Sequence, residues 1–149
     1  MRRLFSILVL SFVLSSLFAD NLVKKREMRG AWIATVANID WPVNRTNGEA
    51  QQKELIEMLD SLAACRINAV FFQVRPCADA LYESELEPWS SYVSGQQGKQ
   101  PTPFYDPLQM IVKECHARCM EAHAWINPYR VTNGESEDKL SKNHIYFQR

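Results

Sequence analysis

The sequence has few glycines and no long segment of one charge. Its five glycines form neither GxGxxG nor GxxxxGK, the patterns that hold phosphate groups at the start of a helix. No serine lies in the strand-to-helix turn typical of α/β-hydrolases. Lysine plus arginine number 17, as do aspartate plus glutamate, and Lys24-Lys25-Arg26 is only a short basic run. Neither a nucleotide-binding motif nor a nucleic-acid partner is therefore indicated.

Cysteine is also scarce, with four residues in 149. Cys65 and Cys115 fall at apolar positions of predicted helices, where a free thiol acts as a small hydrophobic group. Cys115 and Cys119 share one predicted helix, whereas zinc ligands usually come in closely spaced pairs that meet across a turn. We therefore expect core packing for these cysteines, with no metal and no cofactor.

One apolar run stands at the start of the chain. Met1-Arg2-Arg3 is followed by an apolar stretch over residues 4–18 and then by Ala19-Asp20. This order of a basic start, an apolar run and a small residue predicts a secretory signal peptide over 1–19. The run is short for a membrane span, although an uncleaved anchor is the alternative. We expect an exported protein, periplasmic or extracellular, with no stable membrane anchor after cleavage.

The remaining chain alternates strand and helix patterns. After a polar linker over 20–28, a domain is expected over 29–149, whose polar end from 132 onward gives no clear element. Apolar runs rich in β-formers predict strands, and apolar residues at helical spacing predict helices. The strands are expected at 30–36, 67–74 and 123–127, and the helices at about 50–65 and 107–119. This order, with a long loop before the second helix, predicts an α/β fold with a parallel sheet.

Polar and aromatic side chains follow each predicted strand. The carboxyl ends of parallel strands meet at one edge of a sheet, where ligands bind in such folds. Amides and guanidinium groups suit sugar hydroxyls, and flat aromatic rings suit the apolar side of a pyranose. We expect Arg75, Asn127 and Arg130 to lie within one sugar length of each other. The candidate substrate-binding residues are Asp40, Trp41, Arg75, Asp79, Asn127, Tyr129 and Arg130.

The four tryptophans fall into two groups. Trp32 and Trp125 lie within predicted strands, so we expect them in the core. Trp41 and Trp89 lie in loops and are candidates for stacking on a ligand.

Three glutamates in the long loop carry carboxylates of the kind that acid/base catalysis uses. Glu83, Glu85 and Glu87 alternate with other residues. This spacing in a loop is more typical of a solvated face, so we do not assign them a catalytic role.

Four blocks carry a resemblance to a known family. "MRGAWIATVANIDWP", "NAVFFQVRPCADALYESELEPWS", "DPLQMIVKECHARCMEAHAWINPYRV" and "NHIY" are similar to the bacterial glycosyl-hydrolase-like family 10, long described as a domain of unknown function. The resemblance covers about residues 27–147. It implies an exported protein with a (β/α)8 TIM-type barrel that acts on glycan, with bacterial cell-wall glycan as an associated substrate class. It also implies that Arg75, Asp79, Asn127, Tyr129 and Arg130 line the active-site end.

The chain departs from this family in two respects. Cys119 stands where the family usually has glycine, although cysteine suits a left-handed helix end poorly. With about three strands and two helices, the chain corresponds to the N-terminal part of a barrel, which needs eight such units.

The resemblance leaves the catalytic groups open. Glycosidic hydrolysis normally needs two carboxylates, and no such pair is evident. We expect a fragment, inactive alone, whose partners are glycan and the missing part of the barrel. The alternatives are a non-catalytic glycan-binding module and a truncated-gene remnant.

Overall fold

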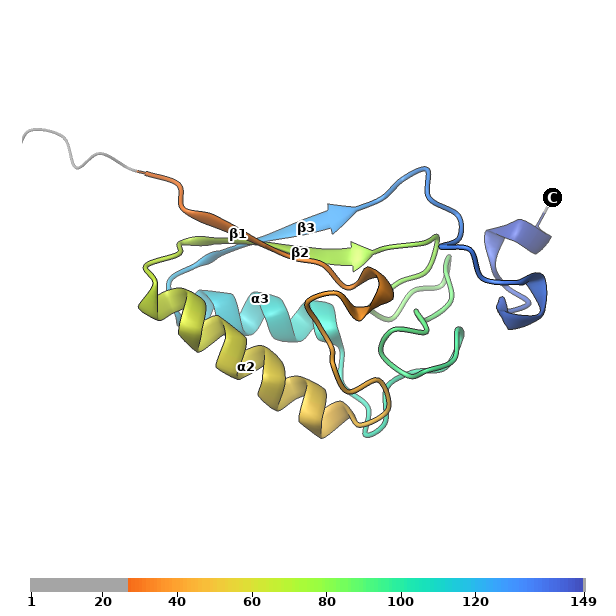
Figure 1. Cartoon of the computed structure of the whole chain (residues 1–149), viewed down its shortest axis with the longest axis horizontal. Coiled ribbons are helices and arrows are strands. Elements are labelled where there is room, and N and C mark those ends of the chain that lie inside the picture. The colour runs from red at the N-terminus through yellow and green to blue at the C-terminus, as the bar shows by residue number, and fades with distance from the viewer. Residues whose placement is uncertain (1–26, 149) are drawn as a thin grey trace, which may run out of the picture.

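Three parallel strands form one sheet in the computed structural model, which describes residues 27–148 (Figure 1). The strands are β1 (Gly30–Ile33), β2 (Ala69–Arg75) and β3 (Glu121–Ile126), in the order β1-β2-β3. The predicted parallel α/β arrangement of three strands and two helices is confirmed. The predicted signal peptide and nearly all of the predicted linker lie outside the described residues.

Two helices connect the strands, and local sequence sets where each begins. α2 (Gly48–Ala64) starts after Asn47, whose side chain accepts hydrogen bonds from the backbone N–H groups of Glu49 and Ala50. α3 (Pro107–Ala117) starts after Asp106, whose carboxylate accepts a hydrogen bond from the N–H of Gln109 at 2.9 Å. Such N-caps satisfy donors that a helix leaves unpaired at its start, and proline suits the first helical position. The predicted start at Asp106-Pro107 is confirmed.

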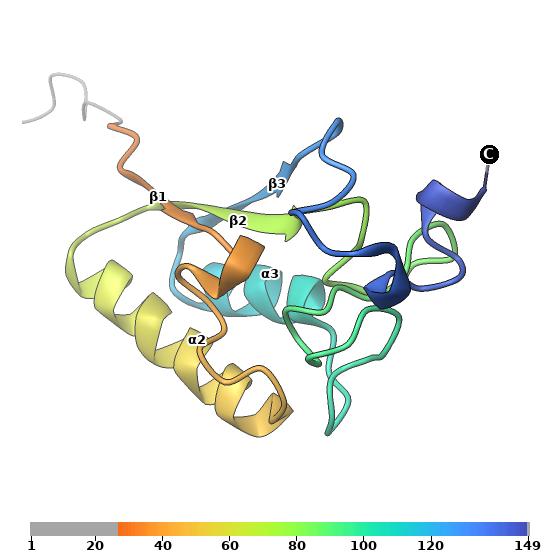
Figure 2. The same cartoon turned by 45° about the vertical axis from the view of Figure 1, so that its right-hand side comes forward.

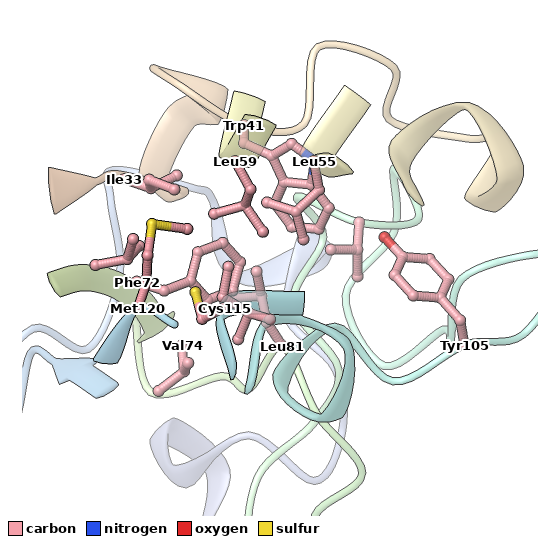
Figure 3. Packing of buried hydrophobic residues seen from close by; sticks show 13 residues of the cluster. Ile33, Trp41, Leu55, Leu59, Phe72, Val74, Leu81, Tyr105, Cys115 and Met120 are labelled. Atoms are coloured by element: carbon pink, nitrogen blue, oxygen red, sulfur yellow. The ribbon is translucent and has the colours of Figure 1, made fainter. Parts of the chain in front are cut away.

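The hydrophobic core fills the space between the sheet and the two helices, which lie on one face of it (Figure 1). Val70, Phe72 and Val74 alternate along β2 and belong to one buried cluster with Leu55 and Leu59 of α2. Figure 3 shows part of this cluster, including Phe72 and Leu59. All five side chains are at most 3% exposed. Burying a side chain of this size stabilises the fold by roughly 1.5–3 kcal/mol relative to leaving it in water. The core therefore fixes which face of β2 meets the helices.

The opposite face of the sheet is open within the described part of the chain. Trp32, Phe71 and His123 are register partners across the three strands, and their rings stack at centroid distances of 4.3 and 4.7 Å. The prediction of a core position for Trp32 is wrong, because its side chain is 59% exposed. Its neighbour Ile33 points to the helices instead, since adjacent residues of a strand face opposite sides.

The first strand ends earlier than predicted. It stops at Ile33, and a short 3-10 helix, η1 (Val36–Asn38), follows. Ala37 and Asn38 both have φ near +55°, a left-handed conformation that no strand adopts. This turn brings the chain back over the carboxyl edge of the sheet. Two further 3-10 helices, η2 (Glu137–Lys139) and η3 (Ile145–Phe147), lie in the C-terminal segment, where no element was predicted. Within residues 27–148 no helix is long and apolar enough to cross a membrane.

Both helices end in the same hydrogen-bonded turn. After α3, the N–H of Met120 donates to Cys115 O, and the N–H of Cys119 donates to His116 O. These two bonds define a Schellman motif, whose left-handed position usually holds glycine. Cys119 occupies that position with φ of 55°, and Arg66 does so after α2 with φ of 58°. The helix end expected from the family's glycine is thus retained, with a side chain in an unfavourable backbone conformation.

Replacing Cys119 with glycine should stabilise the protein. A residue with a Cβ costs about 1–2 kcal/mol in the left-handed region, so we expect Cys119→Gly to raise the free energy of unfolding by about 1 kcal/mol. Urea denaturation with an unchanged slope would measure this gain. Cys119→Ala removes the thiol but keeps the Cβ, and as the control it should give no comparable gain. A loss of stability in Cys119→Gly would contradict the assignment of this turn.

Candidate functional site

The end of β1 is attached to β2 by the buried side chain of Gln73. Gln73 Oε1 accepts hydrogen bonds from the backbone N–H groups of Thr35 and Val36, both at 2.9 Å. The hydroxyl of Thr35 donates to the Gln73 carbonyl, also at 2.9 Å. Because two N–H donors face the same atom, that atom must be the amide oxygen. Gln73 Nε2 is then left buried without a partner among the described residues.

The end of β2 is attached to β3 by Arg75. Its guanidinium Nη1 donates to the backbone carbonyl of Asn127 at 2.6 Å, and its Nε donates to both carboxylate oxygens of Glu87 at 2.6 and 2.9 Å. A further contact joins Arg75 Nη2 to Glu87. Both side chains are only 17% exposed. Such a fork-shaped, charge-assisted pair is more strongly oriented than a surface ion pair.

Asn127 completes this connection from the side of β3. Its Oδ1 accepts a hydrogen bond from the indole of Trp125 at 3.0 Å, and its Nδ2 donates to Pro76 O at 3.2 Å. The structure therefore brings Arg75 and Asn127 together, as expected. Both side chains also form hydrogen bonds that connect the end of β2 to the segment after β3.

Asp79 lies in the segment after β2, and its side chain is 2% exposed. Its Oδ1 accepts a hydrogen bond from the N–H of Cys77 at 3.0 Å, and its Oδ2 accepts one from Gln97 Nε2 at 3.4 Å. Burial raises the pKa of Asp79 from 3.8 to about 6, against the opposing effect of hydrogen bonds that include one from Ser90. The carboxyl group is therefore poised to hold a proton in mildly acidic solution.

A second buried cluster joins the C-terminal segment to the same edge. His144 is fully buried, its Nδ1 accepts a hydrogen bond from the N–H of Tyr146, and its Nε2 lies 3.3 Å from Cys77 O. The proton must therefore sit on Nε2, which donates to that carbonyl. Burial, followed by the charge of Asp79, raises the pKa of the Cys77 thiol to about 11. Cys77 is consequently a packing residue rather than a nucleophile.

The other candidate residues differ in their exposure. Asp40 is exposed, and its Oδ2 accepts a hydrogen bond from the N–H of Ala34 at 2.7 Å. Tyr129 is 94% exposed, and Arg130 is exposed as well. Neither of these two side chains makes a hydrogen bond or ion pair within residues 27–148. They are available to a ligand, in contrast to Arg75 and Asp79.

Trp41 is not available for stacking on a ligand, which corrects the expectation for this residue. Its side chain is fully buried, its ring packs against Phe72, and its indole donates to Gln51 O at 3.0 Å. The ring reaches the core because the turn after β1 folds back onto α2. Trp89, the other loop tryptophan, is partly buried and packs against the same core. Trp125 is partly exposed rather than a core residue.

Several residues of this edge were not predicted as site residues. Glu87 was expected on a solvated face, but it is the partner of Arg75. No local pattern identifies it, since the two residues are 12 positions apart and meet only because the loop folds back. Gln73 had one signal, a polar residue within an apolar strand. His144 had none beyond its place in the quoted block "NHIY".

A cleft of about 500 Å³ opens beside these residues. Figure 2 shows the C-terminal segment beside the loop between β2 and α3. The cleft lies between these two segments, and Arg45 adds to its wall from the loop before α2. Its remaining lining residues are Ser91, Tyr92, Gly95, Gln96, Gln97, Glu135, Asp138, Lys139 and Leu140.

The cysteines and the acidic groups do not assemble a metal site in the part of the chain that the structure covers, where no three His, Cys, Asp or Glu side chains converge suitably. All four cysteines are free. Cys115 is buried as expected, but Cys65 is exposed, because it caps α2 instead of facing the core.

Comparisons with known proteins identify similar sequences. Residues 27–148 match the profile of the family described as glycosyl hydrolase-like 10. The glycosyl hydrolase YngK of Bacillus subtilis is 45% identical over 145 residues, which are 96% of this chain and 28% of that protein. The glycosyl hydrolase DigH of Escherichia coli is 47% identical over 113 residues, which are 70% of this chain and 25% of that protein. The chain thus spans about a quarter of the length of the curated relatives it matches.

The burial of Asp79 predicts a pH-dependent stability. Because its pKa is raised to about 6 in the folded protein, the folded state binds a proton more tightly than the unfolded chain between about pH 4 and pH 6. Stability should therefore fall as the pH rises through this window, by on the order of 2–3 kcal/mol. Asp79→Asn, which keeps an acceptor for the N–H of Cys77, should remove most of this slope.

Carbon-13 NMR titration of the Asp79 carboxyl group tests the same claim directly. A midpoint near 6 is expected, and the exposed control Asp40→Asn should leave that midpoint in place. A midpoint below 4 would contradict the assignment.

Proposed function

The chain belongs to the glycosyl hydrolase-like 10 family, and we propose that it is the N-terminal portion of a barrel that hydrolyses glycosidic bonds in bacterial cell-wall or another polysaccharide glycan. The observation that carries this proposal is the polar edge formed by the three strand ends. At that edge Arg75 and Asn127 are held in place, and Tyr129 and Arg130 follow β3 with free side chains. A guanidinium and a flat ring match the hydroxyls and the apolar face of a sugar.

The open face of the sheet supports the barrel in this proposal. In a (β/α)8 barrel the helices lie outside, and the other face of the sheet points into the barrel, where its side chains are packed. Trp32, Phe71 and His123 lie on that face, opposite α2 and α3, and their rings stack across the three strands. Ile126, on the helix side of β3, is 53% exposed, as expected where a further helix would pack. We propose that the rest of the barrel covers both surfaces.

The reaction needs two carboxylates beside the glycosidic bond. Asp79 is buried, and Glu87 is neutralised by Arg75, which leaves Asp40 as the exposed carboxylate of these three. One exposed carboxylate does not supply both an acid and a base. We propose that residues 27–148 position the glycan, and that at least one catalytic carboxylate belongs to the remainder of the barrel.

The proposal includes export from the cytoplasm. It rests on the basic start, apolar run and small residue in 1–19. N-terminal sequencing of the protein recovered from outside the cytoplasm should begin near Asp20. An intact Met1 on that protein would contradict cleavage.

A chimera tests the proposed hydrolysis. Residues 27–148 would replace the matching segment of the Bacillus subtilis relative, and the release of reducing ends would be followed on peptide-free cell-wall glycan and on a β-1,4-glucan. We expect turnover by the chimera and none by residues 20–149 alone. Arg130→Ala in the chimera should lower the rate roughly tenfold, about 1.4 kcal/mol, without changing the unfolding midpoint.

The control for this experiment is Lys113→Ala, an exposed substitution on α3, which should leave the rate unchanged. A folded chimera that releases no reducing ends from either substrate would contradict the proposal. If that chimera still binds glycan, the non-catalytic binding module becomes the better account. Robust turnover by residues 20–149 alone would show that the carboxylate pair has been misplaced.

A further inference from the structure

The cleft beside the edge of the sheet has walls that are fixed to the site residues. Gln97 donates from Nε2 to Asp79, while its Oε1 accepts a hydrogen bond from the N–H of Ser141 at 2.9 Å. One side chain thus joins the segment after β2, the loop and the C-terminal segment. His144 fastens the C-terminal segment a second time through Cys77 O. The cleft therefore lies between two segments that hydrogen bonds hold together.

The loop wall is also fixed to η1, the 3-10 helix that follows β1. The Nδ2 group of Asn38 donates to the carbonyl of Tyr92 at 2.9 Å and to that of Pro42 at 2.8 Å. Gly98, with φ of 84°, lies where an added Cβ would clash with the Ser141 side chain. The loop and the C-terminal segment therefore approach each other closely on one side of the cleft.

Some polar groups in the cleft are unpaired, while Gln97, Glu135 and Asp138 are engaged by the protein. Arg45 and Gln96 are exposed, and neither side chain makes a hydrogen bond or ion pair to any residue in 27–148. The ammonium group of Lys139 has no carboxylate within salt-bridge distance in the same range. Glu135 uses one oxygen to accept a hydrogen bond from the N–H of Asn133 at 2.8 Å, which leaves the other free. The cleft thus offers donors and acceptors without a partner of its own.

The charges of the lining residues cancel. Arg45 and Lys139 contribute two positive charges, and Glu135 and Asp138 contribute two negative charges. An anion would meet two carboxylates, and a cation would meet two basic groups. A neutral ligand with many hydroxyl or amide groups can instead pair with groups of both signs. A cleft of about 500 Å³ is within the usual range of small-ligand sites.

We infer that this cleft is a binding subsite for a neutral sugar unit of the glycan, next to the strand-end site. This inference rests on the proposed function for the identity of the ligand as glycan. It adds a location, because the resemblance to the family pointed to the strand ends and not to the loop or to residues 135–140. Arg45 and Gln96 are the side chains that recognise the sugar most directly, since both are free to bond.

Nitrogen-15 NMR titration of the full chain tests the subsite. The probes are the β-1,4-linked tetramers of N-acetylglucosamine and of glucose. At least one should cause saturable shifts in the amide signals of residues 91–97 and 135–140. Arg45→Ala and Gln96→Ala should each weaken that binding at least threefold. Both side chains are exposed and unpaired, so neither variant should affect folding. Lys113→Ala, in the separate groove between α2 and α3, is the matched control and should bind as the wild type does.

Three results would overturn the inference. One is the absence of saturable shifts with either tetramer. Another is a set of shifts confined to the open face around Trp32 and His123. The third is a stronger response of the cleft to inorganic phosphate than to the sugars. Failure here is separable from failure of the proposed function, because binding by this chain and turnover by the chimera are measured independently.

Discussion

The arrangement of the strand ends depends on the guanidinium group of Arg75. It binds Glu87 in the long loop and the carbonyl of Asn127 after β3, so one side chain joins β2 to both. The Arg75 and Glu87 side chains are 17% exposed, where losing one partner leaves a charge poorly compensated. With Gln73 holding the end of β1, the ends of both β1 and β3 are attached to β2. The free side chains of Tyr129 and Arg130 therefore follow a strand end that hydrogen bonds hold in position.

The side chains at the strand ends thus divide into those that shape the edge and those that are exposed and free to bond. Arg75, Asn127 and Asp79 are engaged by the protein itself, whereas Arg130 and the cleft residues Arg45 and Gln96 are not. The two faces of the sheet also differ in whether the protein itself covers them. The helix face is closed by a continuous core, while the layer of stacked rings around Phe71 is open in residues 27–148. A protein that binds glycan along this edge would use a rigid sheet end with adaptable polar groups around it.

The elements were predictable where local physics decides them. Leu55 and Leu59 recur at helical spacing, and Asp106-Pro107 is a strong start signal, so both helices were found. Burial was less predictable, because it depends on where the chain turns. Trp32 lies in a strand but on the open face, and Trp41 lies in a loop that folds onto the core. Glu87 could not be assigned either, since its partner is set by the path of the long loop rather than by neighbouring residues.

A double-mutant cycle between Arg75 and Glu87 measures the interaction on which this account depends. The free energy of unfolding would be compared for Arg75→Leu, Glu87→Gln and the double variant, with the exposed Glu85→Gln as the control. We expect a coupling energy of roughly 1.5–3 kcal/mol, while Glu85→Gln stays within about 0.5 kcal/mol of the wild type. Additive effects of the two substitutions, within about 0.3 kcal/mol, would contradict the claim that this pair holds the strand ends together.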